Sequence, residues 1–285
     1  MAPGKIFFLG FGYCARALAG LLQAESWAVS GSCQDEASWD DLKKAGFEAI
    51  SAEDALPPEA LAGVTHFLNS VPPGGNGDPF ISSMLAAPEK LQGIPWTGYL
   101  SSLGVYGGSA GELMGEGSIP KPSHERAKRR LEAEQAWQAL DPNMHVFRLA
   151  GIYGPGRSTL DRVRAGRAER IEKPGHEFSR IHVADVVAVL RASINRPNAG
   201  AIYNVLDDEA AAQARVVEYA CGLLGTKPPP LIPFDEAQKT LSPMSLSFWQ
   251  DFRRVDNSRI KKELGVRLAY PTYREGLTAI FEDGG

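Results

Sequence analysis

The segment Gly10-Phe11-Gly12-Tyr13-Cys14-Ala15 has the residue types and the spacing that can hold a diphosphate. Gly10 permits a tight turn, Gly12 lets the backbone approach phosphate oxygens, and Ala15 lets a helix and a strand pack closely. The segment directly follows the apolar run 5–9, and a helix beginning here would present N–H groups and its positive dipole end to an anion. We therefore expect this turn to bind a dinucleotide cofactor.

The end of the second expected strand bears on which dinucleotide is bound. NAD-binding chains usually carry Asp or Glu there, about 20 residues after the glycines. Here the strand ends in Ser32 and Gln34, which can hydrogen-bond either a ribose hydroxyl or a 2′-phosphate. Arg16, at the start of the first helix, can pair with a 2′-phosphate. Asp35 is either a ribose ligand or a first-turn acid of the next helix, and the pattern favours NADP over NAD.

A parallel sheet is expected to position these residues. Apolar runs predict strands at 5–9, from 27, and at 47–50, 65–70, 98–102 and 145–149. Helical spacing predicts helices at 15–24, 39–45, 79–91 and 124–140. This alternation indicates βαβ units and a Rossmann-type, doubly wound α/β fold over residues 1–156. Residues 157–285 have fewer strands, with helices expected at 184–194, 216–224 and 257–264 and a strand at 201–205. They should form a smaller substrate-binding cap, interleaved with the first domain and packed on it.

Composition excludes several classes of protein. The 285 residues carry a formal net charge of −4, so no broad basic surface is available for nucleic acid. No apolar run approaches the ~20 residues of a membrane span, and the N-terminal run is too short for a signal peptide. The three cysteines have neither disulfide nor metal spacing, so we expect no metal and a cytoplasmic location. A homodimer is left open.

Five short motifs, in order, resemble the extended short-chain dehydrogenase/reductase family of NAD(P)-dependent epimerases and dehydratases. They are the glycine turn, 99–107 (YLSSLGVYG), 148–156 (RLAGIYGPG), 180–185 (RIHVAD) and 203–207 (YNVLD). The resemblance covers nearly the whole chain and implies a Rossmann-type sheet with a small C-terminal substrate domain. It also implies that Ser102 takes the family's catalytic Ser/Thr position and that the cofactor lies along Ser70, Val71, Pro72 and Ser101.

The family's Tyr-x-x-x-Lys pair is missing, which marks an atypical member. One alignment places His124 at the Tyr position. The alignment that we prefer replaces Tyr with Arg126 and Lys with Arg130, and Arg130 then takes the ribose-holding place. Arginine is a poor acid or base near neutral pH, whereas histidine titrates in that range. Tyr106 and Tyr153 are further candidates for the proton carrier.

Several of these residues also have a purely structural interpretation. Ser102 can cap the turn after its strand, and Ser123 can cap a helix that has His124 in its first turn. Asp185 is expected to cap the next helix, with His182 packed beneath it.

Two functions follow from these patterns. The first is an NAD(P)-dependent oxidoreductase or epimerase-like enzyme for a small or nucleotide-sugar-like substrate, in which Ser102 polarises the substrate oxygen. The second is a non-catalytic NAD(P)-binding sensor or regulator, similar to the NmrA-like proteins. The missing Tyr/Lys pair favours the sensor, whereas the retained Ser102 and Tyr106 favour the enzyme, and we expect the enzyme.

Overall fold

The structure is a computed structural model that describes residues 3–34, 36–57, 59–108 and 111–284. Its centre is a seven-stranded sheet of order β11-β7-β5-β4-β1-β2-β3. The strands are β1 Lys5–Leu9, β2 Ala28–Cys33, β3 Glu48–Ser51, β4 His66–Asn69, β5 Trp96–Ser102, β7 His145–Leu149 and β11 Ile202–Val205. The pairs β3–β2, β2–β1, β1–β4 and β4–β5 are parallel. The chain order reverses between β1 and β4, and ligands of such sheets bind at the carboxyl ends of the strands at this point.

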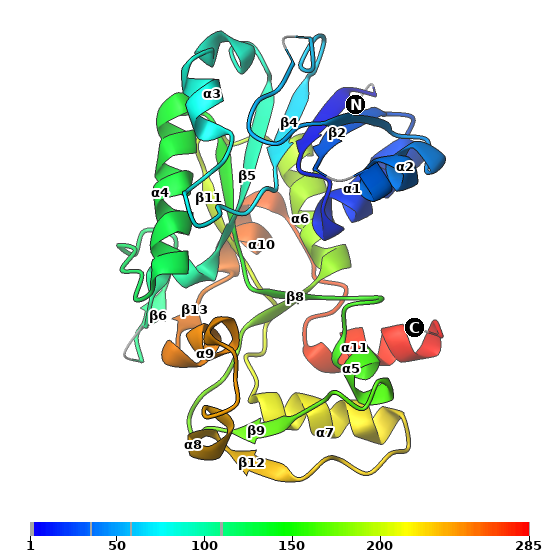
Figure 1. Cartoon of the computed structure of the whole chain (residues 1–285), viewed down its shortest axis with the longest axis vertical. Helices are drawn as coiled ribbons and strands as arrows, with labels where there is room; N and C mark the ends of the chain where they lie inside the picture. Colours follow the sequence, from blue (N-terminus) through cyan, green and yellow to red (C-terminus); the bar gives the residue numbers. More distant parts are fainter. Residues whose placement is uncertain (1–2, 35, 58, 109–110, 285) are drawn as a thin grey trace. The chain divides into compact units, whose positions relative to one another are not determined.

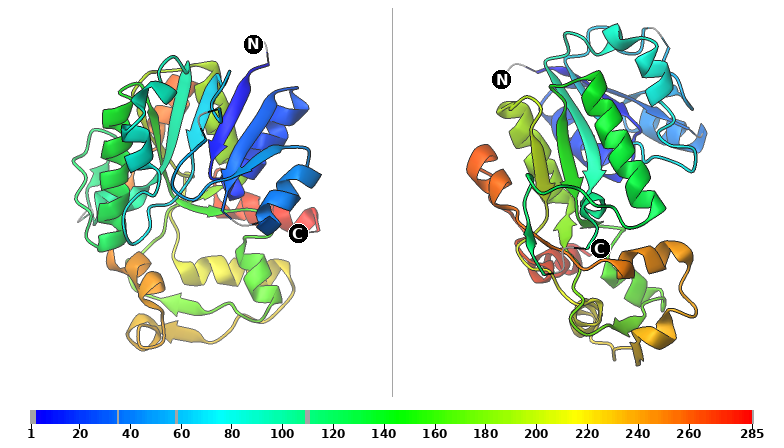
Figure 2. Two further views of the ribbon diagram at one scale, coloured as in Figure 1. Left: turned by 45° about the horizontal axis from the view of Figure 1, so that its top comes forward. Right: turned by 90° about the vertical axis from the view of Figure 1, so that its left-hand side faces the viewer.

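Helices cover both faces of the sheet (Figures 1 and 2). Helices α3 Ile81–Leu85 and α4 Glu125–Leu140 lie on one face, and α1 Tyr13–Ala24, α2 Glu36–Lys44 and α6 Val183–Asn195 lie on the other. Under α3 and α4 the strands contribute Phe7, Phe67 and Tyr99 to a buried cluster that includes Trp137 of α4. Such two-sided burial explains why the strands are apolar on both faces. The predicted doubly wound α/β fold is thus confirmed.

Contacts divide the chain into two units that alternate along it. The first comprises 1–105, 125–148 and 189–203, and the second comprises 106–124, 149–188 and 204–285. Their boundaries do not coincide with the expected division between 1–156 and 157–285.

The second unit contains short parallel strand pairs and helices. The pairs are β8 Gly151–Tyr153 with β10 Arg180–His182, β9 Arg170–Glu172 with β12 Leu231–Pro233, and β6 Leu113–Met114 with β13 Arg254–Val255. The helices are α5 Thr159–Arg164, α7 Gln213–Leu223, α8 Phe234–Ala237, α9 Pro243–Gln250, α10 Ser258–Leu264 and α11 Tyr273–Glu282. A core that includes Tyr153, Leu160, Val216 and Leu277 joins β8 to α5, α7 and α11. Within the described ranges, no helix has the length and apolar run that a membrane crossing requires.

Two expectations about helices need correction. The helix expected over 79–91 is wrong, because α3 ends at Leu85 and a separate 3-10 turn covers Pro88–Lys90. Pro88 has no N–H to donate and disfavours helical backbone in the residue before it. Helix α11 was not expected, although Thr272 and Glu275 form a capping box whose T-x-x-E pattern is visible in the sequence.

Candidate functional site

The two glycines of the turn after β1 have different structural requirements. Gly10 has φ +80°, and a Cβ there would lie 2.7 Å from Cγ2 of Val71, so the protein itself requires glycine. Gly12 has φ −80°, and a Cβ there would meet nothing within 4 Å. The structure therefore leaves the backbone of Gly12 open to a ligand. Helix α1 begins here with no capping side chain and no acid in its first turn, which suits a diphosphate.

Hydrogen bonds brace this turn against the ends of β2 and β4. The Gly10 amide donates to Oγ of Ser32 at 3.0 Å, and the Phe11 amide donates to the Ser32 carbonyl at 2.9 Å. From β4, the Ser70 hydroxyl donates to the Gly10 carbonyl at 2.5 Å. Ser32 and Ser70 thus fix the turn, which is a bracing role that the sequence motif did not indicate. The Ser32 hydroxyl accepts in this contact and keeps its hydrogen for a further partner.

Phe11 is a core residue of the first unit. Its ring is 5% exposed and packs on Phe8 and Phe47. It lies over Gly31 so closely that a Cβ on Gly31 would collide with it. Its ring is thus part of the core, and its amide N–H already has the Ser32 carbonyl as its partner.

The other residues expected at the cofactor vary in exposure. Tyr13, Arg16 and Val71 are half-buried, and Gln34 and Pro72 are exposed. Cys14 and Ala15 are buried beneath the start of α1, as close packing of helix and strand requires. Asp35 lies outside the described residues.

The carboxyl end of β5 carries the two serines of the second motif. The Ser102 Oγ accepts a hydrogen bond from the Gly104 amide at 3.1 Å, so the expected turn-capping contact is present. This contact orients the hydroxyl and leaves its hydrogen to donate to a ligand. The Ser101 hydroxyl instead donates to Glu134 at 2.6 Å. Glu134 forms a buried ion pair with Arg148 at 2.5 Å. Ser101 therefore belongs to an internal network that ties β5 to α4 and β7.

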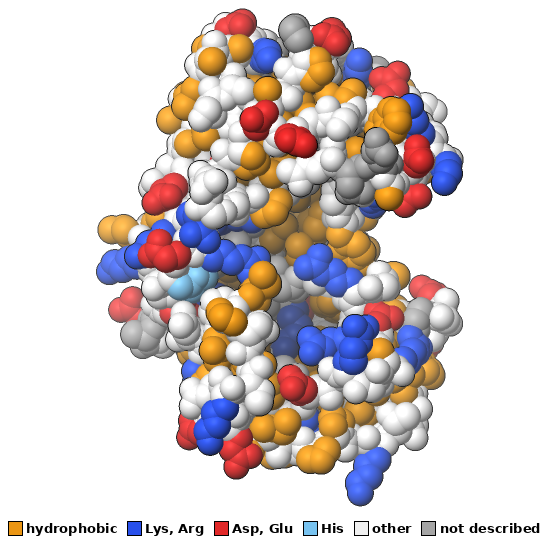
Figure 3. Space-filling model, in the orientation of Figure 1, with side chains coloured by type: hydrophobic (Ala, Val, Ile, Leu, Met, Phe, Trp, Pro, Cys, Tyr) orange, Lys and Arg blue, Asp and Glu red, His pale blue; other side chains and the backbone are white. Residues whose placement is uncertain are grey.

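Arg130 of α4 also reaches the carboxyl end of β5. Its Nη1 donates to the Leu100 carbonyl at 3.0 Å and to the Tyr99 hydroxyl at 3.3 Å. Burial raises the pKa of Tyr99 to about 12, although the positive charge of Arg130 acts in the opposite direction. Figure 3 shows Lys and Arg side chains gathered over the N-terminal turns of α4, where Arg126, Lys128, Arg129 and Arg130 lie.

The three expected catalytic residues are divided between the units, with Ser102 in the first and Tyr106 and His124 in the second. The Tyr106 side chain is 1% exposed and donates to Oδ1 of Asn204 at 2.8 Å, which is a core role. His124 is half-buried. The Ser123 hydroxyl donates to Asp251, so the expectation that it caps α4 is replaced by a contact with a distant segment of the second unit.

Asp185 differs from its expected role, whereas His182 is buried against aromatic rings as expected. The Asp185 carboxylate accepts from the amides of Ala269 and Tyr270 at 2.7 and 3.0 Å, so it holds a later loop rather than capping α6. His182 Nδ1 accepts from the Ala184 amide at 3.2 Å, so the hydrogen of the neutral ring lies on Nε2. That nitrogen has no partner among the described residues, and burial lowers the pKa of His182 to about 4.

Asp207 is an unusual buried carboxyl group in the second unit. Its side chain is 3% exposed, and neither oxygen has a hydrogen-bond partner within the described part of the chain. Burial raises its pKa to about 8, although the charge of Arg180 and nearby backbone amides act in the opposite direction. The Arg180 guanidinium itself donates to the carbonyls of Phe178 and Ala211. No sequence feature indicated that this aspartate is buried.

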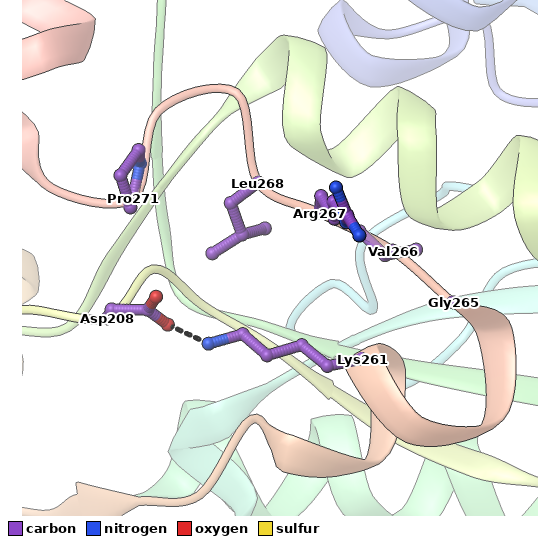
Figure 4. A pocket seen from close by; sticks show the side chains of 7 residues that line it. All are labelled: Asp208, Lys261, Gly265, Val266, Arg267, Leu268 and Pro271. Carbon is purple, nitrogen blue, oxygen red and sulfur yellow. Dashed lines mark hydrogen bonds and ion pairs between the residues drawn. The ribbon is translucent and has the colours of Figure 1, made fainter.

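A cavity of about 510 Å³ opens in the second unit between α10 and the loop after it (Figure 4). None of the expected site residues lines it. An ion pair between Lys261 and Asp208 crosses one side of the cavity, so this cation already has a counter-charge. The lining residues are Asp208, Lys261, Gly265, Val266, Arg267, Leu268 and Pro271.

The chain is similar to one curated protein over nearly its whole length and to another over about half of it. No family model matches it. It is 26% identical over 284 residues to protein YeeZ of Escherichia coli, covering 94% of this chain and 96% of the relative. Over 138 residues it is 30% identical to a 3-diazoavenalumate denitrifying reductase of Streptomyces, which covers 46% of this chain and 45% of that protein.

Solved structures extend the comparison to the fold. A functionally unknown conserved protein of Silicibacter pomeroyi is 42% identical, has a TM-score of 0.92, and matches over 98% of this chain and 99% of its own. The UDP-glucuronic acid 4-epimerase of Bacillus cereus, in complex with NAD, has a TM-score of 0.76 at 14% identity, covering 98% and 97% of the two chains. The chain therefore belongs to the family of the Silicibacter pomeroyi protein and has the fold of the NAD-dependent epimerases and dehydratases, the extended short-chain dehydrogenase/reductases.

Proposed function

We propose that the protein binds a nicotinamide dinucleotide at the turn after β1, with NADP preferred to NAD. The observation that carries the proposal is the space beside Gly12, which the fold leaves open at the start of α1 although its backbone does not need glycine. The solved epimerase of the same fold in complex with NAD supports this cofactor class. Two sequence features support NADP. The end of β2 has Ser32 and Gln34 in place of an acid, and α1 carries Arg16, which can pair with a 2′-phosphate.

We further propose that the protein is an oxidoreductase. The bound dinucleotide would supply the hydride donor or acceptor. The Ser102 hydroxyl, held by the Gly104 amide, would donate to the substrate oxygen and stabilise the negative charge that develops there. The reductase relative in Streptomyces supports a redox function for the half of the chain that it matches.

The proton carrier must differ from that of the typical family site. Arg126 and Arg130 stand at the Tyr and Lys positions in the preferred alignment, and a guanidinium group is a poor proton donor or acceptor. We retain His124 as the residue that exchanges the proton, because it is half-buried and imidazole is the commonest general acid and base in enzymes. Tyr106, the other candidate, is less suited to this role, because its side chain is 1% exposed and its hydroxyl donates to Asn204. The same substitutions favour the alternative of a cofactor sensor without turnover.

Cofactor titration and a substrate screen test both parts of this proposal. NADPH and NADH binding would be followed by nicotinamide fluorescence for the wild type and for Gly12→Val, whose larger side chain fills the open space. We expect tighter binding of NADPH and at least a tenfold loss in the variant. Equal affinities of the variant and the wild type would refute the cofactor site.

Turnover separates the enzyme from the sensor. Nicotinamide absorbance would be followed with a panel of alcohols, carbonyl compounds and nucleotide sugars. Ser102→Ala should lower kcat at least tenfold without changing cofactor affinity, because it removes one hydrogen bond to the reacting oxygen. Tight cofactor binding without turnover across the panel would favour the sensor. The kcat of His124→Gln should then be compared with that of the wild type from pH 5 to 9. An unchanged dependence of kcat on pH would exclude His124 as the proton carrier.

A further inference from the structure

The cavity beside α10 has walls of two kinds. On the loop that follows α10, apolar side chains come from Val266, Leu268 and Pro271. Across from them lies the ion pair between Lys261 and Asp208 (Figure 4). The volume of about 510 Å³ falls within the range of cavities that hold small molecules. The cavity can therefore take a ligand with an apolar body and a polar group.

Hydrogen bonds hold the two walls in place. The amides of Ala269 and Tyr270 donate to the carboxylate of Asp185 at 2.7 and 3.0 Å, which fixes the middle of the loop. The Asp208 amide donates to the Pro271 carbonyl at 2.8 Å, which joins the loop to the opposite wall. All of these residues belong to the second unit. The fold itself thus shapes the cavity, so that binding a ligand requires little further ordering of the loop.

The charges that line the cavity do not balance. Lys261 has its counter-charge in Asp208, and the same carboxylate oxygen accepts from Nδ2 of Asn257 at 2.7 Å. The second cation of the lining is Arg267, on the loop. It forms no hydrogen bond or ion pair with the part of the chain that the structure describes. Two cations and one carboxylate therefore leave the lining with one positive charge that has no partner.

We propose that this cavity binds a small organic anion, in which Arg267 holds a carboxylate or phosphate group and the apolar wall holds the rest of the ligand. A guanidinium group suits the purpose because its planar fork donates paired hydrogen bonds to such oxygens. Leu268, the next residue, lines the same cavity, so one loop supplies both the charged and the apolar contacts. The site is separate from the turn after β1, which belongs to the first unit, and does not depend on the proposed cofactor.

Ligands of similar shape but different charge test the proposal. Hexanoate and hexyl phosphate would be compared with neutral hexanamide by ligand-observed NMR, at constant ionic strength and with and without saturating NADPH. The wild type should bind at least one of the anions at least tenfold more tightly than hexanamide, and NADPH should not displace it. The comparison of the two anions shows whether a carboxylate or a phosphate is the group bound.

Three substitutions separate the charge of the cavity from the charge of the surface. Arg267→Gln removes the partner of the anion and should weaken its binding at least tenfold. Asp208→Asn keeps the shape of the side chain but removes the negative charge beside Lys261, so anion binding should tighten at least threefold. Lys262→Gln is the control, because Lys262 is exposed on α10 and lies outside the lining. This variant should bind the anions as the wild type does, and no variant should change the affinity for hexanamide.

Four results would overturn this inference. The first is no detectable binding of the anions, or binding equal to that of hexanamide. The second is an equal loss of affinity in Arg267→Gln and Lys262→Gln, which would indicate only a general attraction between charges. The third is weaker anion binding in Asp208→Asn. The fourth is an anion that NADPH displaces or that Gly12→Val no longer binds, since it would belong to the turn after β1. If the wild type binds the anions but no dinucleotide, only the cofactor proposal fails.

Discussion

The buried carboxyl group of Asp207 predicts an unusual dependence of stability on pH. Its pKa is raised from 3.8 to about 8 in the folded protein, mainly by burial. A group whose pKa is raised on folding binds its proton more tightly in the folded state than in the unfolded state. Its stabilising contribution is complete below the unfolded pKa and is lost as the pH rises through the folded pKa. Between about pH 5 and 7 the loss is about 1.4 kcal/mol per pH unit, since the unfolded chain has released the proton and the folded chain has not.

Replacing Asp207 with Asn should remove this dependence. The amide has nearly the same shape as the protonated carboxyl group and does not titrate. We expect the difference in unfolding free energy between Asp207→Asn and the wild type to grow in favour of the variant by about 1.4 kcal/mol per pH unit from pH 5 to 7. Comparing the two proteins cancels the contributions of His176 and His182, whose pKa values are lowered to about 4.

Urea denaturation at pH 5, 6, 7 and 8 measures this difference. Circular dichroism follows the unfolding of the whole chain, and hydrogen exchange in peptides from α7 and α11 reports on the stability of the second unit. Asp208→Asn is the matched control, because Asp208 is partly exposed and paired with Lys261. A wild type and an Asp207→Asn variant with parallel pH profiles would refute the reasoning, as would a variant that loses stability relative to the wild type as the pH rises.

Two further predictions concern the first unit. Glu134→Ala leaves Arg148 buried without its carboxylate and should lower the unfolding free energy by about 3–5 kcal/mol, whereas Glu125→Ala removes an exposed pair and should leave the urea midpoint unchanged. An equal loss of unfolding free energy in the two variants would contradict the buried ion pair between Glu134 and Arg148. Gly10→Ala should destabilise the protein by about 2 kcal/mol, and Gly12→Ala should change its stability by less than about 1 kcal/mol, both measured by thermal unfolding. A Gly12→Ala variant that unfolds as readily as Gly10→Ala would show that the fold also needs Gly12.

Much of the fold was predictable because its signals are local. The strands β1, β2, β4, β5 and β7 are apolar runs buried on both faces, and α4 is a long charged helix between two of them. The short strand pairs of the second unit were not predictable. The pair β6–β13 joins Leu113 to Arg254 across about half of the chain, with two residues in each strand, and nothing local marks either segment as a strand.

The roles of individual site residues were harder to predict than the fold. The motif placed Ser32 and Ser101 beside the cofactor, whereas their hydroxyl groups take part in hydrogen bonds within the fold. A serine at a strand end has the same local sequence in either role, and only its partner in the fold distinguishes them. For Ser101 that partner is Glu134, 33 residues later in the chain. Glu134 is itself buried because its charge is paired with Arg148.

The turn glycines show where a sequence motif and a structure differ in what they explain. The motif asks for glycine at both positions, whereas in the structure Gly10 has a left-handed backbone and a close neighbour and Gly12 has neither. The fold therefore accounts for Gly10 completely, with or without a ligand. It leaves Gly12 unexplained, because alanine would fit its backbone and meet no atom of the described chain. The open Cβ position of Gly12 lies at the N-cap of α1, after the first strand, where a ligand can approach the backbone and the N–H groups of the helix. Gly12 is for that reason the strongest single argument for a bound diphosphate, and cofactor affinity, rather than stability, is the property that its substitution should change.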